Sequence, residues 1–211
     1  MDGNARWAKA HGVPVLEGHR QGAKTLKQIV KDSVKLGIEE LTVYAFSTEN
    51  WQRPQDEVQG LMAMFAELID SETPELDEEG VRMRFIGRRD EVSARLQDRM
   101  NWAEAETETN TRMQLFVAFN YGGRAEILDA AARFEGGSEE DFKEHLYAPE
   151  MSDPDLLIRT SGEIRTSNFL LWQCAYSELV FTETLWPDFS EDDLRAALDE
   201  YDARGRRFGA R

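Results

Sequence analysis

Residues 153–187 read DPDLLIRTSGEIRTSNFLLWQCAYSELVFTETLWP, and this stretch decides how the rest of the chain is interpreted. The apolar run at 156–158 predicts a buried strand that breaks at the following Thr-Ser-Gly. Arg159, Arg165 and Ser167 come next, and Glu178 precedes a second run typical of a strand. Guanidinium groups and hydroxyls after a buried strand match the oxygens of a phosphate-bearing ligand. A polar loop that makes only surface ion pairs fits the stretch equally well.

The composition indicates a soluble, folded and acidic chain. Its 211 residues are 41% hydrophobic and 31% charged, with a net charge of −16. That charge argues against a nucleic-acid-binding surface and against a polybasic membrane patch. No apolar run approaches the roughly 20 residues of a membrane span, and the start lacks a secretory pattern. The single cysteine, Cys174, excludes an internal disulfide; interpreted as a buried structural thiol, it favours a cytoplasmic location.

The chain opens MDGNARWAK, in which Asp2, Gly3 and Asn4 precede a predicted first helical turn. Unpaired N–H groups at a helix start attract anions. An aspartate beside a bound phosphate also suits a divalent cation such as Mg²⁺. An ordinary Asn or Asp helix cap is the alternative interpretation. His19 begins the next predicted helix, and a lone histidine in such a place is usually structural.

Apolar periodicity predicts strands that alternate with helices along the whole chain. Strands are expected at 41–46, 81–87, 113–119, 156–158 and after 178, and helices at 18–36, 55–71, 90–107, 124–134, 139–146 and 190–203. The acidic stretch 67–79 is expected to be a solvated helix end and turn. This order predicts one α/β domain over residues 1–211, with a central, mostly parallel sheet flanked by helices.

Polar and aromatic side chains follow the strand at 41–46, where α/β folds place ligands. They are Ser47, Glu49, Asn50, Trp51 and Arg53. The helix after them has one broad apolar side with small residues at Gly60, Ala63 and Ala66. That side is explained by core packing or by a hydrophobic tunnel, and periodicity does not separate the two.

The usual catalytic patterns are missing from the sequence. It has no P-loop lysine, no zinc-ligand cysteine spacing and no nucleophile elbow. What remains is three polar loops that follow strands, together with Asp2 and Glu178. Such a set suits the binding of two anionic groups around one cation, with catalysis by positioning and charge stabilisation.

Long motifs, in order along the chain, carry a family resemblance. They are MDGNARWAK, Gly18-His19, YAFSTENWQRP, FNYGGRAEI, DPDLLIRTSGEIRTSNFLLWQ, AYSELVFTETLWPDF and RRFG. The chain resembles the cis-prenyltransferase (isoprenyl transferase) family, and within it the bacterial undecaprenyl diphosphate synthases. The aspartate-rich motif of the unrelated trans-prenyltransferases is absent.

The resemblance implies a magnesium-dependent homodimer in the cytoplasm that adds isopentenyl diphosphate repeatedly to an allylic diphosphate such as farnesyl diphosphate. It implies a hydrophobic tunnel between the 55–71 helix and the sheet. The product would be undecaprenyl diphosphate or a similar lipid-carrier precursor, released through peripheral membrane contact. A non-catalytic binding subunit of the same fold is the first alternative, and an α/β phosphohydrolase is the second.

The resemblance also assigns residues to roles. It makes Asp2 and Asn50 catalytic, with Asp2 and Glu178 as metal carboxylates. It places around the allylic substrate Gly3, Asn4, Ala5, Arg6, Trp7, His19, Ser47, Thr48, Glu49, Trp51 and Arg53. It places around isopentenyl diphosphate Arg159, Arg165, Thr166 and Ser167. The family assigns the proton acceptor to Asn50, but a neutral amide is a poor base, so this side chain could instead orient a phosphate oxygen or water.

Three departures from the family pattern affect these expectations. Val15 stands where many relatives carry an arginine near the allylic diphosphate. Ile164 stands where some carry a histidine beside the metal, so no metal role is expected there. Relatives have a segment with a strand before the Met1-Asp2 motif, which favours the interpretation that this sequence is trimmed at its start over the loss of a sheet strand.

Overall fold

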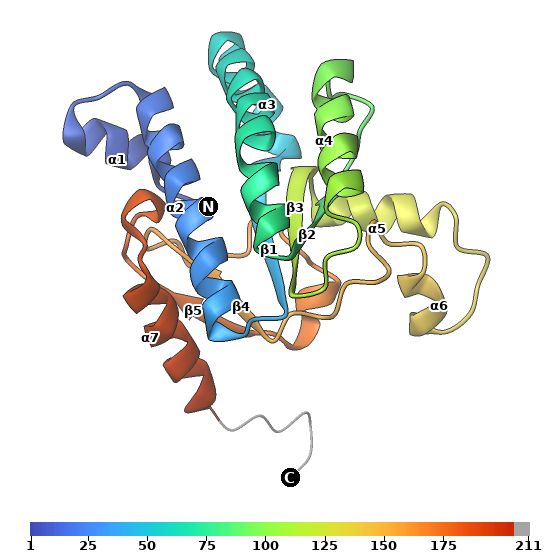
Figure 1. The fold of residues 1–211 in the computed structure, drawn as a ribbon. Coiled ribbons are helices and arrows are strands. Elements are labelled where there is room, and N and C mark those ends of the chain that lie inside the picture. Colours follow the sequence, from blue (N-terminus) through green and yellow to red (C-terminus); the bar gives the residue numbers. More distant parts are fainter. Residues whose placement is uncertain (205–211) are drawn as a thin grey trace. The chain divides into compact units, whose positions relative to one another are not determined.

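The computed structural model describes residues 1–204 and contains two compact units (Figure 1). Unit 1 consists of residues 1–32 and the chain from 152 onward, and unit 2 of residues 33–151. The helices are α1 (Asn4–His11), α2 (Val15–Leu36), α3 (Gln55–Glu78), α4 (Ala94–Glu106), α5 (Gly123–Ala131), α6 (Glu139–Lys143) and α7 (Glu191–Asp202), with 3-10 turns η1 (Thr48–Gln52), η2 (Gln173–Tyr176) and η3 (Trp186–Asp188). The strands are β1 (Glu40–Ser47), β2 (Val81–Ile86), β3 (Met113–Tyr121), β4 (Leu156–Arg159) and β5 (Glu178–Phe181).

Unit 2 is built on a parallel three-stranded sheet in the order β1-β3-β2. The central strand β3 is buried along nearly its whole length, as expected of a strand covered on both faces. Helices α3 and α4 pack against each other and against β2 (Figure 1). Stacked or edge-to-face rings of Phe46, Phe65 and Phe119 fill the space beside the sheet. The parallel register brings the carboxyl ends of all three strands to one edge of the sheet.

Unit 1 joins the two ends of the chain. Strands β4 and β5 form a parallel pair, with Leu156 opposite Glu178 and Arg159 opposite Phe181. Helix α7 packs on β5, and α1 packs on η3. The indole N–H of Trp186 donates to the carbonyl of Gly22 on α2 (2.8 Å), which fixes that helix to the segment after β5.

All strand pairings are parallel and helices flank them, which confirms the predicted α/β class. Within residues 1–204 the strands lie in two hydrogen-bonded sheets, one of three strands and one of two. One domain over residues 1–211 stays a prediction, as does the tunnel beside α3. Of the small residues proposed to open that tunnel, Ala66 is buried and Ala63 is exposed.

Two local predictions need correction. The helix expected over 55–71 is longer, because α3 continues to Glu78 with Pro74 inside it, so the acidic stretch 67–79 is a helix end whose turn begins only at Glu79. The hydroxyl of Thr73, which is fully buried, donates to the carbonyl of Ile69 in the preceding turn (2.7 Å). Cys174 is only partly buried, although burial still raises the pKa of its thiol. The basic end 204–209, including the RRFG motif, lies outside the described residues except for Arg204.

None of the helices within residues 1–204 is both long enough and apolar enough to cross a bilayer.

An ion pair in unit 2 gives a prediction about acid stability. Arg88 donates two hydrogen bonds to Asp129 (2.9 and 2.7 Å), and the hydroxyl of Tyr147 donates to the same carboxylate. The hydrogen bonds from Arg88 and Tyr147 hold the pKa of Asp129 below its ordinary value of 3.8, although partial burial acts in the opposite direction. We expect Asp129→Asn to lower the free energy of unfolding by about 1–2 kcal/mol at pH 7, after allowance for solvent screening.

The sign of the pH dependence follows from the lowered pKa. The stabilisation by Asp129 is complete above the pKa of the unfolded chain and is lost as the pH falls through the lower pKa of the folded protein. The difference between wild type and Asp129→Asn should therefore shrink below about pH 4. Urea unfolding of both proteins at pH 7 and at the lowest pH where both fold would check this. A difference that stays constant or grows in acid would contradict it.

Candidate active site

The backbone at Asp2 is fixed by the segments that follow β4 and β5. Its carbonyl oxygen accepts hydrogen bonds from the hydroxyl of Ser161 (2.5 Å) and the amide of Trp186 (3.0 Å). Its carboxylate oxygen Oδ1 accepts from the amide of Gly3 (2.9 Å). The acidic side chain is therefore placed by three contacts within unit 1, and 39% of it remains exposed.

Helix α1 begins directly after this carboxylate. Gly3 is its N-cap residue, has a left-handed backbone (φ 102°), and no side chain caps the helix. The first amides of an α-helix have no partner within the helix. With the positive end of the helix dipole, they form a seat for an anionic group. The expected Asn or Asp cap is wrong, because a glycine occupies the cap position.

Gly3 gives a prediction about this close packing. A Cβ added to Gly3 would lie 2.3 Å from the Ser161 hydroxyl oxygen and 3.0 Å from a Leu185 methyl carbon, and its φ disfavours any L-side chain. We expect Gly3→Ala to lower the free energy of unfolding by roughly 2–4 kcal/mol, from backbone strain and overpacking together. Denaturant unfolding measures the effect.

Gly12→Ala is the matched control. Gly12 also has a left-handed backbone (φ 67°), but nothing lies within 4 Å of its added Cβ. This change should cost only about 1 kcal/mol from conformation alone. Equal losses in the two variants would show that the contact between Gly3 and Ser161 has no energetic weight.

Arg159 is the centre of the site in unit 1. Its Nη2 donates to Asp2 Oδ2 (2.8 Å), and its Nη1 donates to Ser167 Oγ (2.8 Å) and to the carbonyl of Arg165 (2.6 Å). Its side chain is only 15% exposed. The Arg159 guanidinium thus contacts Asp2 at the start of the chain and also Arg165 and Ser167, which are predicted to bind isopentenyl diphosphate.

The charges around Asp2 keep it ionised. Burial raises the pKa of this carboxyl, but the hydrogen bond and charge of Arg159 and the charge of Arg6 outweigh burial, and the net pKa is below 3.8. Arg6 also donates to the carbonyl of Ser161 (2.9 Å) and pairs with Glu163 (3.2 Å). Glu163 pairs with Arg165 as well. The result is a carboxylate within a partly exposed group of three guanidiniums.

The loop between β4 and β5 holds an unusual backbone. Ser161, Ser167, Asn168 and Leu170 are non-glycine residues with positive φ, between 43° and 75°. Such conformations persist where the surrounding structure fixes them, and they concentrate at functional sites. Thr166 lies between Arg165 and Ser167 in this loop. The side chain of Ile164 is 77% exposed.

Glu178 does not join this cluster within the chain. It begins β5, whereas Arg159 ends β4, so the register separates them by about 10 Å along the strands. The Glu178 carboxylate accepts a hydrogen bond from Arg204 at the end of α7 (2.8 Å). The metal role of Glu178 stays a prediction.

The other predicted residues of unit 1 lie on α1 and α2. Trp7 stacks on His11 (4.0 Å between ring centroids), and its indole N–H donates to Asp188 (2.7 Å). Ala5 is exposed in the first turn of α1, and His19 is partly buried near the start of α2. Val15, the first residue of α2, is 40% exposed. Because valine has no guanidinium, this position cannot make the phosphate contact expected of an arginine.

Unit 2 carries the remaining predicted residues on η1. Asn50 Oδ1 accepts from the amide of Ser47 (3.0 Å), which closes the turn, and Thr48 donates to Glu49 (3.2 Å). Arg53 pairs with Glu57 one turn into α3 (3.0 Å). These residues follow the carboxyl end of β1, as the sequence predicts.

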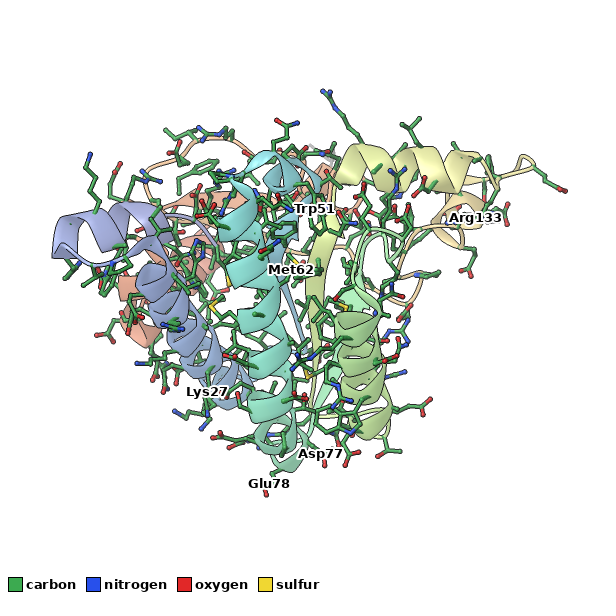
Figure 2. The ribbon with its side chains drawn as sticks, turned by 90° about the horizontal axis from the view of Figure 1, so that it is seen from above. Lys27, Trp51, Met62, Asp77, Glu78 and Arg133 are labelled. Atoms are coloured by element: carbon green, nitrogen blue, oxygen red, sulfur yellow. The ribbon has the colours of Figure 1, made fainter. Side chains whose placement is uncertain are left out.

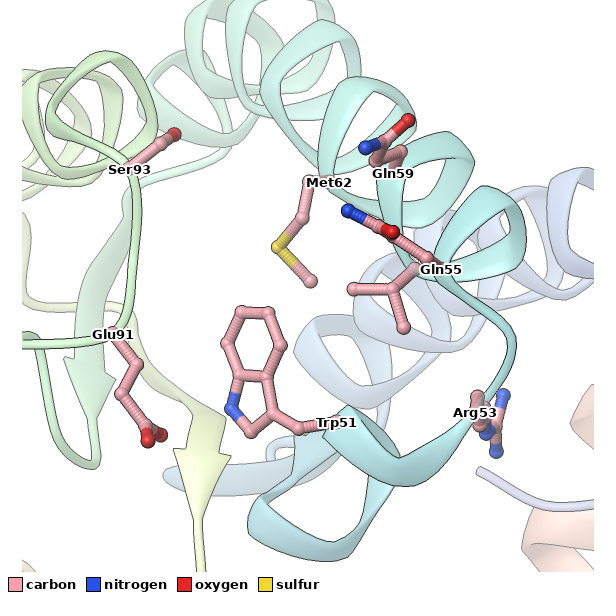
Figure 3. Close-up of a pocket in the computed structure, with 8 residues that line it drawn as sticks. Trp51, Arg53, Gln55, Gln59, Met62, Glu91 and Ser93 are labelled. Atoms are coloured by element: carbon pink, nitrogen blue, oxygen red, sulfur yellow. The ribbon is translucent and has the colours of Figure 1, made fainter.

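Trp51 lines an open groove of about 600 Å³ in unit 2 (Figure 3). Trp51, Val58 and Met62 supply its apolar lining, and Figure 3 shows the Trp51 indole and Met62 pointing into the space between α3 and the 91–93 segment. The polar lining residues are Arg53, Gln55, Gln59, Glu91 and Ser93. The Trp51 indole N–H donates to Asn120 Oδ1 (2.7 Å).

Sequence reasoning missed four residues that contact predicted site residues within their own unit. Ser161 holds Asp2 and Arg6, Glu163 pairs with Arg6 and Arg165, Asn120 binds Trp51, and Arg204 binds Glu178. The position of Glu163 between two arginines was a usable signal. Asn120 lies inside the FNYGGRAEI motif, which had been assigned no role.

The residues near Asp2 fit a magnesium ion that is held mainly by substrate. Within residues 1–204 no group of three His, Cys, Asp or Glu side chains could form a complete metal cage. Mg²⁺ is usually bound through one or two carboxylates and substrate phosphates, so it needs no such cage. Asp2, partly exposed and ionised, could supply a carboxylate ligand in such an arrangement.

Comparison with known proteins places this site in a family. The family model described as "Putative undecaprenyl diphosphate synthase" matches residues 1–209. An isoprenyl transferase of Thermotoga maritima is 49% identical over 218 residues, which cover 99% of this chain and 94% of that protein. The ditrans,polycis-undecaprenyl-diphosphate synthase ((2E,6E)-farnesyl-diphosphate specific) of Micrococcus luteus is 46% identical over 220 residues, covering 99% of this chain and 88% of that protein.

Solved structures agree with the sequence relatives. Lavandulyl diphosphate synthase from Lavandula x intermedia, in complex with dimethylallyl diphosphate, has a TM-score of 0.94 and 37% identity, covering 99% of this chain and 95% of that one. The structure described as that of "a probable undecaprenyl diphosphate synthase" from Campylobacter jejuni has a TM-score of 0.83 and 32% identity, covering 90% of this chain and 92% of that one. The chain therefore belongs to the cis-prenyltransferase family of isoprenyl transferases, the family of undecaprenyl diphosphate synthase.

Proposed function

We propose that the protein condenses isopentenyl diphosphate with an allylic diphosphate, with farnesyl diphosphate as starter, and repeats the step to make undecaprenyl diphosphate or a similar cis-polyprenyl diphosphate. One observation carries the proposal most directly. An ionised carboxylate and a nearly buried guanidinium fork, Asp2 and Arg159, lie side by side at an uncapped helix start. This arrangement offers donors for diphosphate oxygens and one oxygen ligand for a cation within a few ångströms.

Each condensation forms one carbon–carbon σ bond, shifts one double bond, and breaks the allylic carbon–oxygen bond and one carbon–hydrogen bond. The π electrons of the C3=C4 double bond of isopentenyl diphosphate form the new bond between its C4 and C1 of the allylic substrate. The allylic carbon–oxygen bond breaks, and its electron pair leaves with the diphosphate. A proton leaves C2 of the isopentenyl group, and its electron pair forms the new double bond. Negative charge grows on the leaving diphosphate, so groups that bind it more tightly in the transition state increase the rate.

The residues of unit 1 have the chemistry to bind both diphosphates. The unpaired amides of Asn4, Ala5 and Arg6 and the guanidinium of Arg6 suit the allylic diphosphate. The Arg159 fork, Arg165 and the Ser167 hydroxyl suit the diphosphate of the isopentenyl group. Neutralisation of Glu163 by Arg6 and Arg165 reduces repulsion of the incoming anions.

Magnesium would be held by Asp2 together with diphosphate oxygens. When bound, the ion supplies positive charge that stabilises the leaving diphosphate. Asp2 is suited to this task because Arg159 and Arg6 keep it ionised, and because its backbone is fixed by Ser161 and Trp186.

The contacts of Asn50 favour an orienting role over a role as base. Its carbonyl oxygen already accepts the amide of Ser47, which leaves its N–H₂ group to donate. A neutral amide has almost no affinity for a proton at pH 7, so a base at this position would have to be another group. We assign to Asn50 the orientation of a phosphate oxygen or water that takes the proton. Ser47, Glu49 and Thr48 then border the substrate on the same turn.

The proposal includes the partners that the family resemblance implies. The protein would act as a magnesium-dependent homodimer in the cytoplasm and release its product by peripheral contact with a membrane. The names of the relatives support farnesyl diphosphate as starter, since the Micrococcus luteus enzyme is described as specific for it. The lavandulyl diphosphate synthase structure, which is a complex with dimethylallyl diphosphate, supports a different allylic diphosphate as the alternative substrate.

An extraction assay tests the proposed activity. Purified protein is incubated with farnesyl diphosphate and radiolabelled isopentenyl diphosphate, with and without Mg²⁺. The proposal predicts label in the organic extract only when all three components are present, with one diphosphate released per isopentenyl unit. No extractable label would favour the non-catalytic subunit, and release of inorganic phosphate without extension would favour a phosphohydrolase.

A further inference from the structure

Asn120 is a fully buried polar residue at the carboxyl end of β3, next to the turn that carries the predicted substrate residues. It is 0% exposed and has a left-handed backbone (φ 48°). Asparagine tolerates that conformation better than most residues, but a buried amide there still needs partners for its oxygen and nitrogen. The polar atoms of the Asn120 side chain therefore form hydrogen bonds with neighbouring residues and not with solvent.

The Asn120 side chain connects two separate segments. Its Oδ1 accepts the indole N–H of Trp51 (2.7 Å), and its Nδ2 donates to the carbonyl of Arg88 (3.1 Å), with a longer contact to Glu91 (3.4 Å). Its backbone carbonyl accepts the amide of Arg88 (3.2 Å). One residue thus fixes the indole relative to the segment after β2.

The segment after β2 packs tightly against the end of β3. A Cβ on Gly87 would lie 2.1 Å from the carbonyl oxygen of Phe119, so the two backbones approach more closely than a side chain at this position would allow. The side chain of Arg88 is fixed by its two hydrogen bonds to Asp129. Asn120 therefore links Trp51 to a segment that is held by its own packing and hydrogen bonds.

The indole of Trp51 has apolar contacts as well as its hydrogen bond to Asn120. Trp51 makes an edge-to-face contact with Phe46 (5.0 Å, 73°), and it lines the groove with Met62. Neither neighbour can accept the indole N–H, whereas Asn120 can. Figure 3 shows the indole nitrogen turned toward the side of the groove where Glu91 lies. The hydrogen bond to Asn120 selects this orientation of the ring.

We infer that Asn120 is a positioning residue for the reaction: through Trp51 it holds η1, with Asn50 and Ser47, in the conformation that binds the allylic substrate. This inference rests on the proposed function, because Trp51 and Asn50 are assigned to the substrate there. It adds a residue that acts only through Trp51.

Asn120→Gly is the decisive variant, because glycine adopts φ 48° without strain and removes only the side chain. Trp51→Phe removes the indole N–H and keeps an aromatic ring against Phe46. We expect each change to raise KM for farnesyl diphosphate roughly tenfold, with a smaller change in KM for isopentenyl diphosphate. The double variant should be no worse than the poorer single variant, because both remove the same interaction.

Asn110→Ala is the matched control for stability. Asn110 also joins two segments through its amide, donating to Asp77 (2.9 Å) and to the carbonyl of Val81 (3.1 Å), but it precedes β3. Figure 2 shows Asp77 at one end of α3 and Trp51 at the other. We expect Asn110→Ala to lower Tm and leave both KM values unchanged. An Asn120→Gly variant that lowers Tm but leaves both KM values unchanged would reduce Asn120 to a structural residue.

An NMR measurement separates this inference from the proposed function. The Trp51 indole ¹H–¹⁵N signal, assigned as the one of five lost in Trp51→Phe, should exchange slowly with solvent in wild type and fast in Asn120→Gly. Asn120→Asp, which keeps an acceptor oxygen, should retain slow exchange. Equal exchange in wild type and Asn120→Gly overturns the positioning role, whether or not the protein extends prenyl chains. Slow exchange that is lost in Asn120→Gly, in a protein without transferase activity, overturns only the proposed function.

Discussion

Asp2→Ala lowers kcat by roughly 100- to 10,000-fold while the protein stays folded; this is the largest effect that we expect of any single change. The carboxylate is the one ionised oxygen donor at the uncapped start of α1, and charge stabilisation of a leaving diphosphate is worth several kcal/mol. The stability loss should be only about 1 kcal/mol, because Asp2 is partly exposed and Arg159 keeps two other partners. Steady-state kinetics and thermal unfolding measure the two effects.

Asp2→Asn distinguishes a metal role from a structural role. Asparagine keeps an oxygen that can accept from Gly3 or Arg159, but it carries no charge. We expect a kcat as low as that of Asp2→Ala. Calorimetric titrations should also show weaker binding of Mg²⁺ than in wild type. Asp193→Asn is the control, since that carboxylate caps α7 and bonds only Ser190 and Thr184. Near-normal kcat in Asp2→Asn would refute the metal role.

Arg159→Ala gives the second large effect, which we expect mainly on isopentenyl diphosphate. The variant loses all three hydrogen bonds of the guanidinium fork and leaves the Asp2 carboxylate with the Gly3 amide and the longer contact to Arg6. We expect kcat/KM for isopentenyl diphosphate to fall roughly 100- to 1000-fold, from the loss of two or more charge-assisted hydrogen bonds. Kinetics with each substrate varied in turn would locate the effect.

Arg159→Lys should have a kcat/KM for isopentenyl diphosphate less than tenfold above that of Arg159→Ala, because an ammonium lacks the planar fork that spans Asp2 and Ser167. The control is Arg195→Lys. Arg195 makes a one-turn pair with Glu191 on the exposed face of α7, and its replacement should change kcat/KM by less than about twofold. Full recovery in Arg159→Lys would mean that charge alone, without geometry, explains the residue.

The element order could be predicted from the sequence because its apolar periodicity is strong. The buried runs at 41–46, 113–119 and 156–158 all became strands. The course of α3 could not be predicted, since an acidic stretch with Pro74 resembles a helix end and only tertiary contacts show that it continues. In such places packing overrides local preference.

The candidate site could be predicted only where its residues lie close together in the sequence. Arg159, Arg165 and Ser167 are close in sequence and remain together in the structure. The pairing of Arg159 with Asp2 spans 157 positions, and no local pattern contains it. Asn120 was equally hidden, because an asparagine in a strand-to-helix turn resembles an ordinary loop residue until its buried contact with Trp51 is seen.

The mass of the product tests the central claim most directly. Protein, Mg²⁺, farnesyl diphosphate and excess isopentenyl diphosphate are incubated together, and the extracted lipids are analysed by mass spectrometry. We predict a series of polyprenyl diphosphates whose masses differ by one five-carbon unit and that ends near the undecaprenyl length. Recovery of unextended farnesyl diphosphate alone, or of a single short condensation product, would contradict the account.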